Sequence, residues 1–193
     1  GYRFVKWDQD YSYIIKDMDI YPEFTPVLYD LYFHGNDNDS GIMDSIVVAY
    51  ETQVNLPLNT FYKRGYIFLG WKEDINDDDI DYLNGDTFIY DKANSMHLYA
   101  HWQVIEYDII YELDGGTNSL NNPDKYTVED VINLEPALKK DHLCVGWNLE
   151  LLDENEIKML IDVINAGTIG TVILTAVYRY NGFIELKEES MLG

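Results

Sequence analysis

The sequence predicts a strand-dominated α+β chain of tandem repeats that form an elongated array. Aromatic residues make up 15% of the 193 residues, including 17 tyrosines, and large rings favour strands in which they pair across a sheet. The chain also resembles itself at a fixed spacing, which indicates repeats. One apolar pattern, at 153–167, has helical spacing. With 47% hydrophobic residues, the chain can bury cores in two or three small units.

The charge of the chain excludes several classes of partner. There are 35 acidic and 13 basic side chains, for a formal charge of -22, which repels nucleic-acid phosphates and anionic lipid headgroups. No apolar stretch is long enough to span a bilayer and no signal segment opens the chain. We therefore expect no nucleic-acid partner, no membrane insertion of this segment, and an export signal or anchor outside it.

The self-similarity is centred on tryptophans. Trp71 and Trp147 are 76 residues apart, and each is followed 31 residues later by the end of a similar closing segment. Upstream, Tyr29-Asp30-Leu31 and Tyr107-Asp108-Ile109 match at a spacing of 78. The sequence therefore predicts complete repeats at 27–103 and 104–180, followed by a tail or linker at 181–193.

A third, partial copy occupies residues 1–26. Its residues Gly1, Tyr2, Phe4 and Trp7 repeat the spacing of Gly65, Tyr66, Phe68 and Trp71, and its closing strand is expected at 18–24. This segment is predicted to be the C-terminal half of a repeat whose opening strands precede it. It should leave an edge and an apolar face open. Trp7, Trp71 and Trp147 are expected at equivalent core positions.

A helix is predicted at 153–167, as an insertion in the last repeat. Asp153 can cap it, Glu156 completes a capping box, and Gly167 can end it. Between them, apolar residues fall at helical spacing, namely Ile157, Leu160, Ile161 and Ile164.

The segment from Tyr62 to Trp71, with Gly85-Asp86-Thr87 and Leu98-Tyr99-Ala100-His101-Trp102, closely resembles the Listeria-Bacteroides repeat, also called the internalin B repeat. The resemblance implies β-grasp-like repeats strung in arrays on secreted or wall-attached bacterial proteins, often beside leucine-rich repeats. It therefore implies an extracellular location at the bacterial cell surface or cell wall. No catalytic residue is carried over from the family.

Three groups of residues are candidates for a metal site. His97 and His101 would point to one side of a strand about 13 Å apart, which is too far to share an ion. The run Asp74, Asn76, Asp77, Asp78, Asp79 and Asp81 has oxygen ligands but lacks the glycine and distal glutamate of an EF-hand. The loop 36–41 has Val47 where that glutamate would stand. We predict no metal and no cofactor, and calcium at the acidic loops stays an open alternative.

Catalysis is not expected. Cys144, the single cysteine, takes the place of Phe68 and is interpreted as a small core residue, although His142 should point to the same side of its strand. No third group to orient them is evident. We therefore predict no catalytic residues and no enzyme activity.

Two functions remain. In the first, the repeats are a stalk or spacer in adhesion, in contact with neighbouring repeats or leucine-rich repeats of the parent chain. In the alternative, one repeat binds a host protein or glycan directly through exposed aromatic residues and acidic loops.

Overall fold

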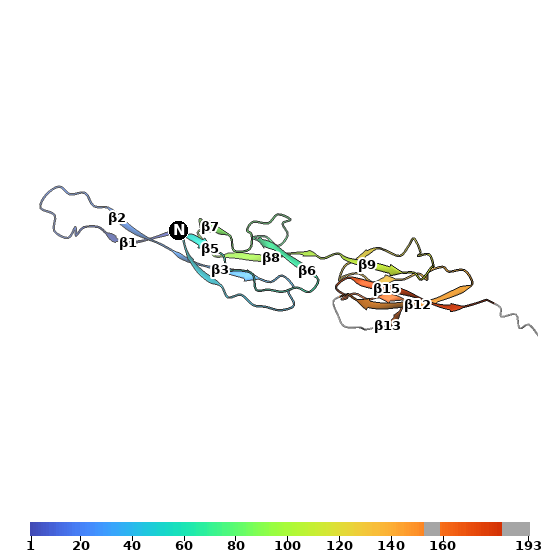
Figure 1. Ribbon diagram of the computed structural model, residues 1–193. Helices are drawn as coiled ribbons and strands as arrows, with labels where there is room; N and C mark the ends of the chain where they lie inside the picture. Colours follow the sequence, from blue (N-terminus) through green and yellow to red (C-terminus); the bar gives the residue numbers. More distant parts are fainter. Residues whose placement is uncertain (153–158, 183–193) are drawn as a thin grey trace, which may run out of the picture. The chain divides into compact units, whose positions relative to one another are not determined.

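The computed structural model describes residues 1–152 and 159–182 and divides the chain into two compact units, residues 1–103 and 104–193 (Figure 1). Every regular element among the described residues is a β-strand. The predicted α+β class is therefore wrong for this part of the chain, which is all-β. The prediction of a strand-dominated chain is confirmed.

The first unit contains a four-stranded mixed sheet with the order β4-β3-β8-β6. β3 (Leu28–His34) runs antiparallel to β4 (Ile46–Ala49) and parallel to β8 (Met96–Val104), with β6 (Tyr66–Lys72) at the edge. β5 (Gln53–Asn55) and β7 (Thr87–Ile89) form a separate antiparallel pair.

The second unit repeats this arrangement with one additional strand. Its sheet has the order β10-β9-β15-β12-β13 and a second pair joins β11 to β14. β9 runs antiparallel to β10 and parallel to β15, as β3 does to β4 and β8. The strands are β9 (Tyr107–Glu112), β10 (Lys125–Tyr126), β11 (Ile132–Asn133), β12 (His142–Leu151), β13 (Met159–Ile161), β14 (Val163–Ile164) and β15 (Val172–Tyr180).

The helix expected at 153–167 is wrong over the described residues 159–167, and 153–158 lie outside them. β13 pairs with β12, with Ile161 opposite Trp147. β14 pairs with β11, and Leu134 N–H donates to the Asp162 carbonyl at 2.8 Å. The backbone groups that would have bonded within a helix therefore form hydrogen bonds to β11 and β12 instead. This tertiary pairing outweighs a helical pattern of apolar residues.

Each unit has its own core, centred on a tryptophan. Trp71 is 0% exposed and Trp147 is 1% exposed, so both are confirmed as core residues. Their indole N–H groups are buried without a hydrogen-bond partner among the described residues. Trp7 is 37% exposed, and its predicted core position is wrong, because among the described residues no strand equivalent to β3 or β9 covers it.

Residues 1–26 form a hairpin of β1 (Tyr2–Trp7) and β2 (Pro22–Pro26). Its register shifts between Phe4 and Lys6. The β12–β15 ladder shifts between Cys144 and Gly146, which are the matching positions of the sequence repeat. The hairpin therefore carries the same irregularity as a complete unit.

The glycine before each core tryptophan allows a close approach of the backbone. A Cβ on Gly70, which has φ +158°, would lie 2.7 Å from the Tyr82 carbonyl oxygen, and one on Gly146 would lie 3.1 Å from that of Ile161. Trp71 pairs with Tyr82 as an isolated bridge, and Trp147 pairs with Ile161 in β13. The Gly-Trp motif thus lets a further segment pair at the edge of the sheet.

Candidate functional site

The outer face of the first unit carries four stacked rings, from Tyr32, His34, His97 and Tyr99, which we call the Tyr-His strip. Parallel pairing places Tyr32 beside His97 and His34 beside Tyr99. Ring centroids are 4.8 Å apart for Tyr32–His97, 5.1 Å for His34–His97 and 4.7 Å for His34–Tyr99, with interplanar angles of 15–20°. Leu31, Phe33, Met96 and Leu98 alternate with these residues and face the core.

The two imidazoles of the strip are joined by a hydrogen bond. His34 Nε2 lies 2.8 Å from His97 Nδ1, so one ring nitrogen donates and the other accepts. Burial lowers the pKa of His34, and the neighbouring His97 lowers it further. The arrangement therefore favours a neutral His34 imidazole at neutral pH.

The Tyr-His strip is a property of the first unit and not a requirement of the fold. The matching positions of the second unit hold Ile110, Glu112, Ile173 and Thr175. There, Thr175 Oγ1 donates to Glu112 Oε2 at 2.9 Å. The same backbone therefore tolerates aliphatic and polar residues on this face, and the stacked rings need a separate explanation.

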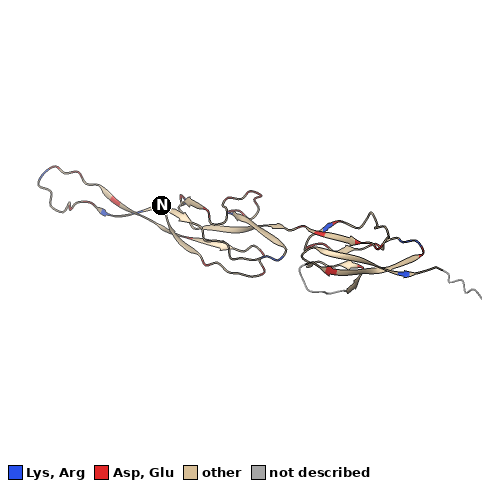
Figure 2. Cartoon of the chain, in the orientation of Figure 1, with Lys and Arg blue, Asp and Glu red and all other residues tan. Residues whose placement is uncertain are grey.

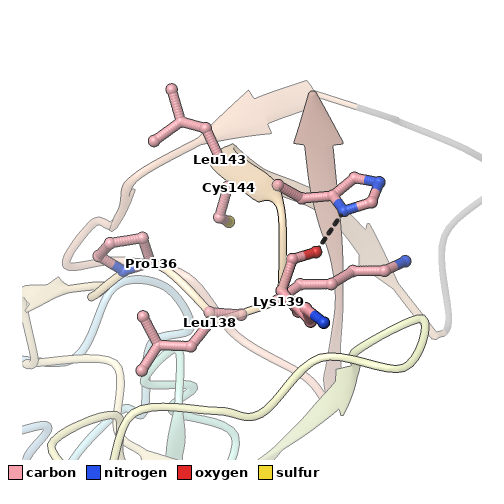
Figure 3. A pocket seen from close by; sticks show the side chains of 8 residues that line it. Pro136, Leu138, Lys139, Leu143 and Cys144 are labelled. Atoms are coloured by element: carbon pink, nitrogen blue, oxygen red, sulfur yellow. Dashed lines mark hydrogen bonds between the residues drawn. The ribbon is translucent and has the colours of Figure 1, made fainter. Parts of the chain in front are cut away.

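The second unit has instead a shallow apolar hollow of about 380 Å³, lined partly by Pro136, Ala137, Leu138 and Cys144 (Figure 3). Ala137 and Cys144 take the places of Phe61 and Phe68, two rings that pack against Trp71 at centroid distances of 6.2 and 5.0 Å. The hollow thus lies where the first unit holds two phenylalanine rings.

Cys144 and His142 each have a local hydrogen-bond partner. Cys144 is 9% exposed and packs in the core, and its Sγ lies 3.5 Å from the Gly146 carbonyl. The His142 ring donates from Nδ1 to the Lys140 carbonyl at 2.7 Å (Figure 3). Nδ1 of this imidazole is therefore engaged by a backbone carbonyl.

Carboxylates of the candidate metal residues accept hydrogen bonds from nearby residues. Asp74 Oδ1 accepts from the Asn76 backbone and side chain, Asp77 Oδ1 accepts from Asp78 N–H, and Asp81 Oδ2 accepts from Glu73 N–H. In residues 1–152 and 159–182 no three His, Cys, Asp or Glu side chains are placed to hold an ion. The His97 ring is hydrogen-bonded to His34 and not to His101. In loop 36–41, Asn36 and Asn38 side chains donate to backbone carbonyls.

Figure 2 colours the Lys and Arg positions blue, and they are scattered along the chain of both units. The ion pairs found in the described part of the chain each use one lysine, as in Lys6–Glu23 at 3.5 Å and Lys139–Asp114 at 2.9 Å. With 13 basic against 35 acidic residues, most carboxylates have no such partner. The surface therefore favours cationic or neutral ligands over anionic ones.

Sequence reasoning missed the Tyr-His strip because it considered His97 only with His101. Tyr32-x-His34 and His97-x-Tyr99 are visible as alternating pairs, and such alternation places both members on one face of a strand. The parallel contact between these two strands, 63 residues apart at His34 and His97, was not predicted.

Comparison with known families agrees with the repeated glycine-tryptophan geometry. Residues 29–101 match the Listeria-Bacteroides repeat domain. These residues are a Listeria-Bacteroides repeat. The match covers the opening strand β3 through to Ala100 and His101 of β8, and so includes the core tryptophan Trp71 and all four residues of the Tyr-His strip.

Two relatives from Evansella cellulosilytica extend the likeness beyond this Listeria-Bacteroides repeat. One, named "Putative Gly-rich membrane protein", is 34% identical over 142 residues, which cover 72% of this chain and 16% of the relative. The other, named "Putative membrane protein", is 30% identical over 162 residues, covering 82% and 23%. The chain thus spans less than a quarter of either relative, and no solved structure matches. Among the described residues, no helix could cross a membrane.

Proposed function

We propose that the chain is a non-catalytic repeat segment of an exported bacterial envelope protein, and that it acts as a spacer in adhesion. The observation that carries the proposal is that each unit closes its own core around one tryptophan. Val172, Leu174 and Ala176 surround Trp147 with residues of the second unit alone, and the core around Trp71 draws on the first unit alone. A self-contained unit can be added to an array without changing its neighbours.

The surface and the relatives support the same proposal. The charge of -22 disfavours collapse of one unit on another at low salt. β8 ends at Val104 and β9 begins at Tyr107, which leaves a connection of two residues. The names of the relatives refer to membrane proteins, which supports a place in the cell envelope. Within it, we assign the segment to the cell surface or cell wall. The mixed sheet in each unit is compatible with a β-grasp-like repeat.

Small-angle X-ray scattering tests the spacer. An array of two units and a hairpin should have a radius of gyration well above the roughly 16 Å of one compact domain of this length. The value should change little between low and high salt if the short connection, and not only charge repulsion, keeps the units apart. A radius near 16 Å at both salt concentrations would contradict a spacer.

A second candidate function is direct recognition of a host glycan or protein by the Tyr-His strip. The strip supports it because Tyr32 and Tyr99 end the stack, where a ring face can contact the apolar face of a sugar. The second unit lacks these rings. A glycan array probed with the chain and with a Tyr32→Ser/Tyr99→Ser variant tests this function. Binding that is lost in the variant but kept in an Ile110→Ser/Thr175→Ala variant, altered on the matching face of the second unit, supports it. Equal binding by all three would contradict it.

A further inference from the structure

The β1–β2 hairpin reproduces the closing hairpin of the first complete unit ring by ring. Phe4 lies 5.5 Å from Trp7 at an interplanar angle of 63°, while Phe68 lies 5.0 Å from Trp71 at 66°. Phe4 and Phe24 are 6.0 Å apart at 76°, and their counterparts Phe68 and Trp102 are 5.5 Å apart at 70°. The hairpin therefore holds half of a repeat core in its packed arrangement.

The part that the hairpin lacks is defined by the complete units. In them, the parallel ladder joins the opening strand to Met96–Tyr99 in one unit and to Val172–Thr175 in the other. The matching residues of the hairpin are Met18–Tyr21, which precede β2 and are not in a strand. Met18 and Ile20 match the buried Met96 and Leu98 but are only half-buried.

The opening strand also supplies the ring that covers the tryptophan. Phe33 lies 5.1 Å from Trp71, and Tyr111 lies 5.3 Å from Trp147. Each ring stands two residues after an apolar residue that is buried in the core, Leu31 or Ile109. Trp7 contacts Tyr11 of its own hairpin at a centroid distance of 6.4 Å, but no ring of an opening strand lies on it in the described residues and it is 37% exposed. The missing partner is therefore expected to be a strand with an apolar residue followed two positions later by an aromatic residue.

The segment Met18–Tyr21 can form a parallel ladder only on the edge that faces away from β1. Asp8 N–H donates to the Tyr21 carbonyl at 3.0 Å, so Tyr21 faces β1, and the backbone groups of Ile20 and Pro22 face the opposite edge. Pro22 has no N–H and ends any ladder there, just where the ladders of the complete units stop. On β1 itself, Lys6 stands in place of Gly70 and Gly146 and pairs with Glu23.

We propose that the hairpin of residues 1–26 binds, in parallel along Met18–Tyr21, an opening strand of its own repeat type with the chemistry of Leu31-Tyr32-Phe33. The occupant is assigned by continuity with the ladders that β3 and β9 already make in this chain. Binding orders Met18–Tyr21 as a strand and brings an aromatic ring onto Trp7. The inference goes beyond the proposed spacer function and does not depend on it.

The test adds an opening half to the full chain. A second copy of residues 27–64, which precede Gly65 in the first complete unit, is fused ahead of Gly1, where it acts at high effective concentration. We expect amide exchange at Ile20, whose backbone groups face the open edge, to slow by at least about tenfold, as pairing protects backbone amides. Trp7 emission should shift to shorter wavelength in a background with the other tryptophans replaced by phenylalanine.

Two matched variants distinguish this pairing from general stabilisation. A fusion carrying Leu31→Ser and Phe33→Ser in the added copy alone should leave exchange at Ile20 as fast as in the chain without a copy. Ile20→Asp should abolish the protection, whereas Asp19→Asn, on the other face, should keep it. Unchanged exchange in the first fusion, or equal protection by the Ser fusion, overturns the proposal. A dimer of the original chain that Ile20→Asp dissociates would also overturn it, because a second copy would then be the occupant.

Discussion

His34 Nε2 and His97 Nδ1 lie 2.8 Å apart across two parallel strands, within a stack of four aromatic rings. Only one of the two nitrogens can donate while the other accepts, so a proton on both rings removes the acceptor. The charge state of this pair therefore links the outer face of the first unit to pH.

The first prediction is a loss of stability as the pH falls through the histidine range. Burial lowers the pKa of His34 below its ordinary value of 6.5 in the folded chain. The unfolded chain therefore binds the proton first, and the free energy of unfolding should decrease as the pH falls below about 6.5. Urea denaturation between pH 7.5 and 5.5 measures this change, above the range in which Asp and Glu titrate.

The control for the pH prediction is a His34→Gln/His97→Gln variant, which should show a smaller decrease over the same range. Some pH dependence should remain, because burial also lowers the pKa of His101. A variant with the same pH dependence as the original chain would show that the paired histidines do not contribute.

The second prediction concerns the core tryptophan of the Listeria-Bacteroides repeat. Trp71→Ala removes a ring that is 0% exposed and should cost about 3–5 kcal/mol of unfolding free energy. Trp71→Phe should cost much less, since it keeps a ring and removes an indole N–H that has no partner in the described structure. Trp7→Ala should change the stability by less than about 1 kcal/mol, because its ring is already exposed. Denaturant midpoints compare the three variants.

A third prediction concerns the glycine before that tryptophan. In Gly70→Ala the new Cβ would meet the Ile80 side chain at 2.5 Å and the Tyr82 carbonyl at 2.7 Å, at a cost of about 1–3 kcal/mol. Gly146→Ala should cost less, because its nearest contacts, with Leu160 and Ile161, are at 3.0 and 3.1 Å. Equal losses of thermal stability in both variants would argue against the close approach as the cause.

The fourth prediction is that the hollow of the second unit can be filled. Cys144→Phe restores the ring that Phe68 supplies in the first unit and should raise the stability of the second unit by about 0.5–2 kcal/mol. Leu143→Phe, which adds a ring to the neighbouring exposed residue, should have little effect. If Cys144→Phe lowers the melting temperature, the hollow is not the space of the missing ring.

Much of the fold follows from periodicity and spacing. The opening strands, the closing strands and the two buried tryptophans were predicted because repeated packing sites recur at the same interval in the chain. The residues at 159–164 were not, because their apolar spacing is compatible with a helix and their strand partners, β11 and β12, are set by distant segments. Local pattern does not decide between such alternatives when another sheet edge is available.

The amino-acid sequence alone predicted the order of the units, a partial copy at residues 1–26 and the core residues Trp71 and Trp147, since these depend on which residue types recur and at what interval. The burial of the two tryptophans confirms the last of these. Only the tertiary structure decided which strands lie side by side. Parallel pairing of β3 with β8 brings His34 to His97, and the absence of an opening strand beside Met18–Tyr21 leaves Trp7 exposed. Both outcomes depend on contacts between segments far apart in the chain, which no local propensity specifies.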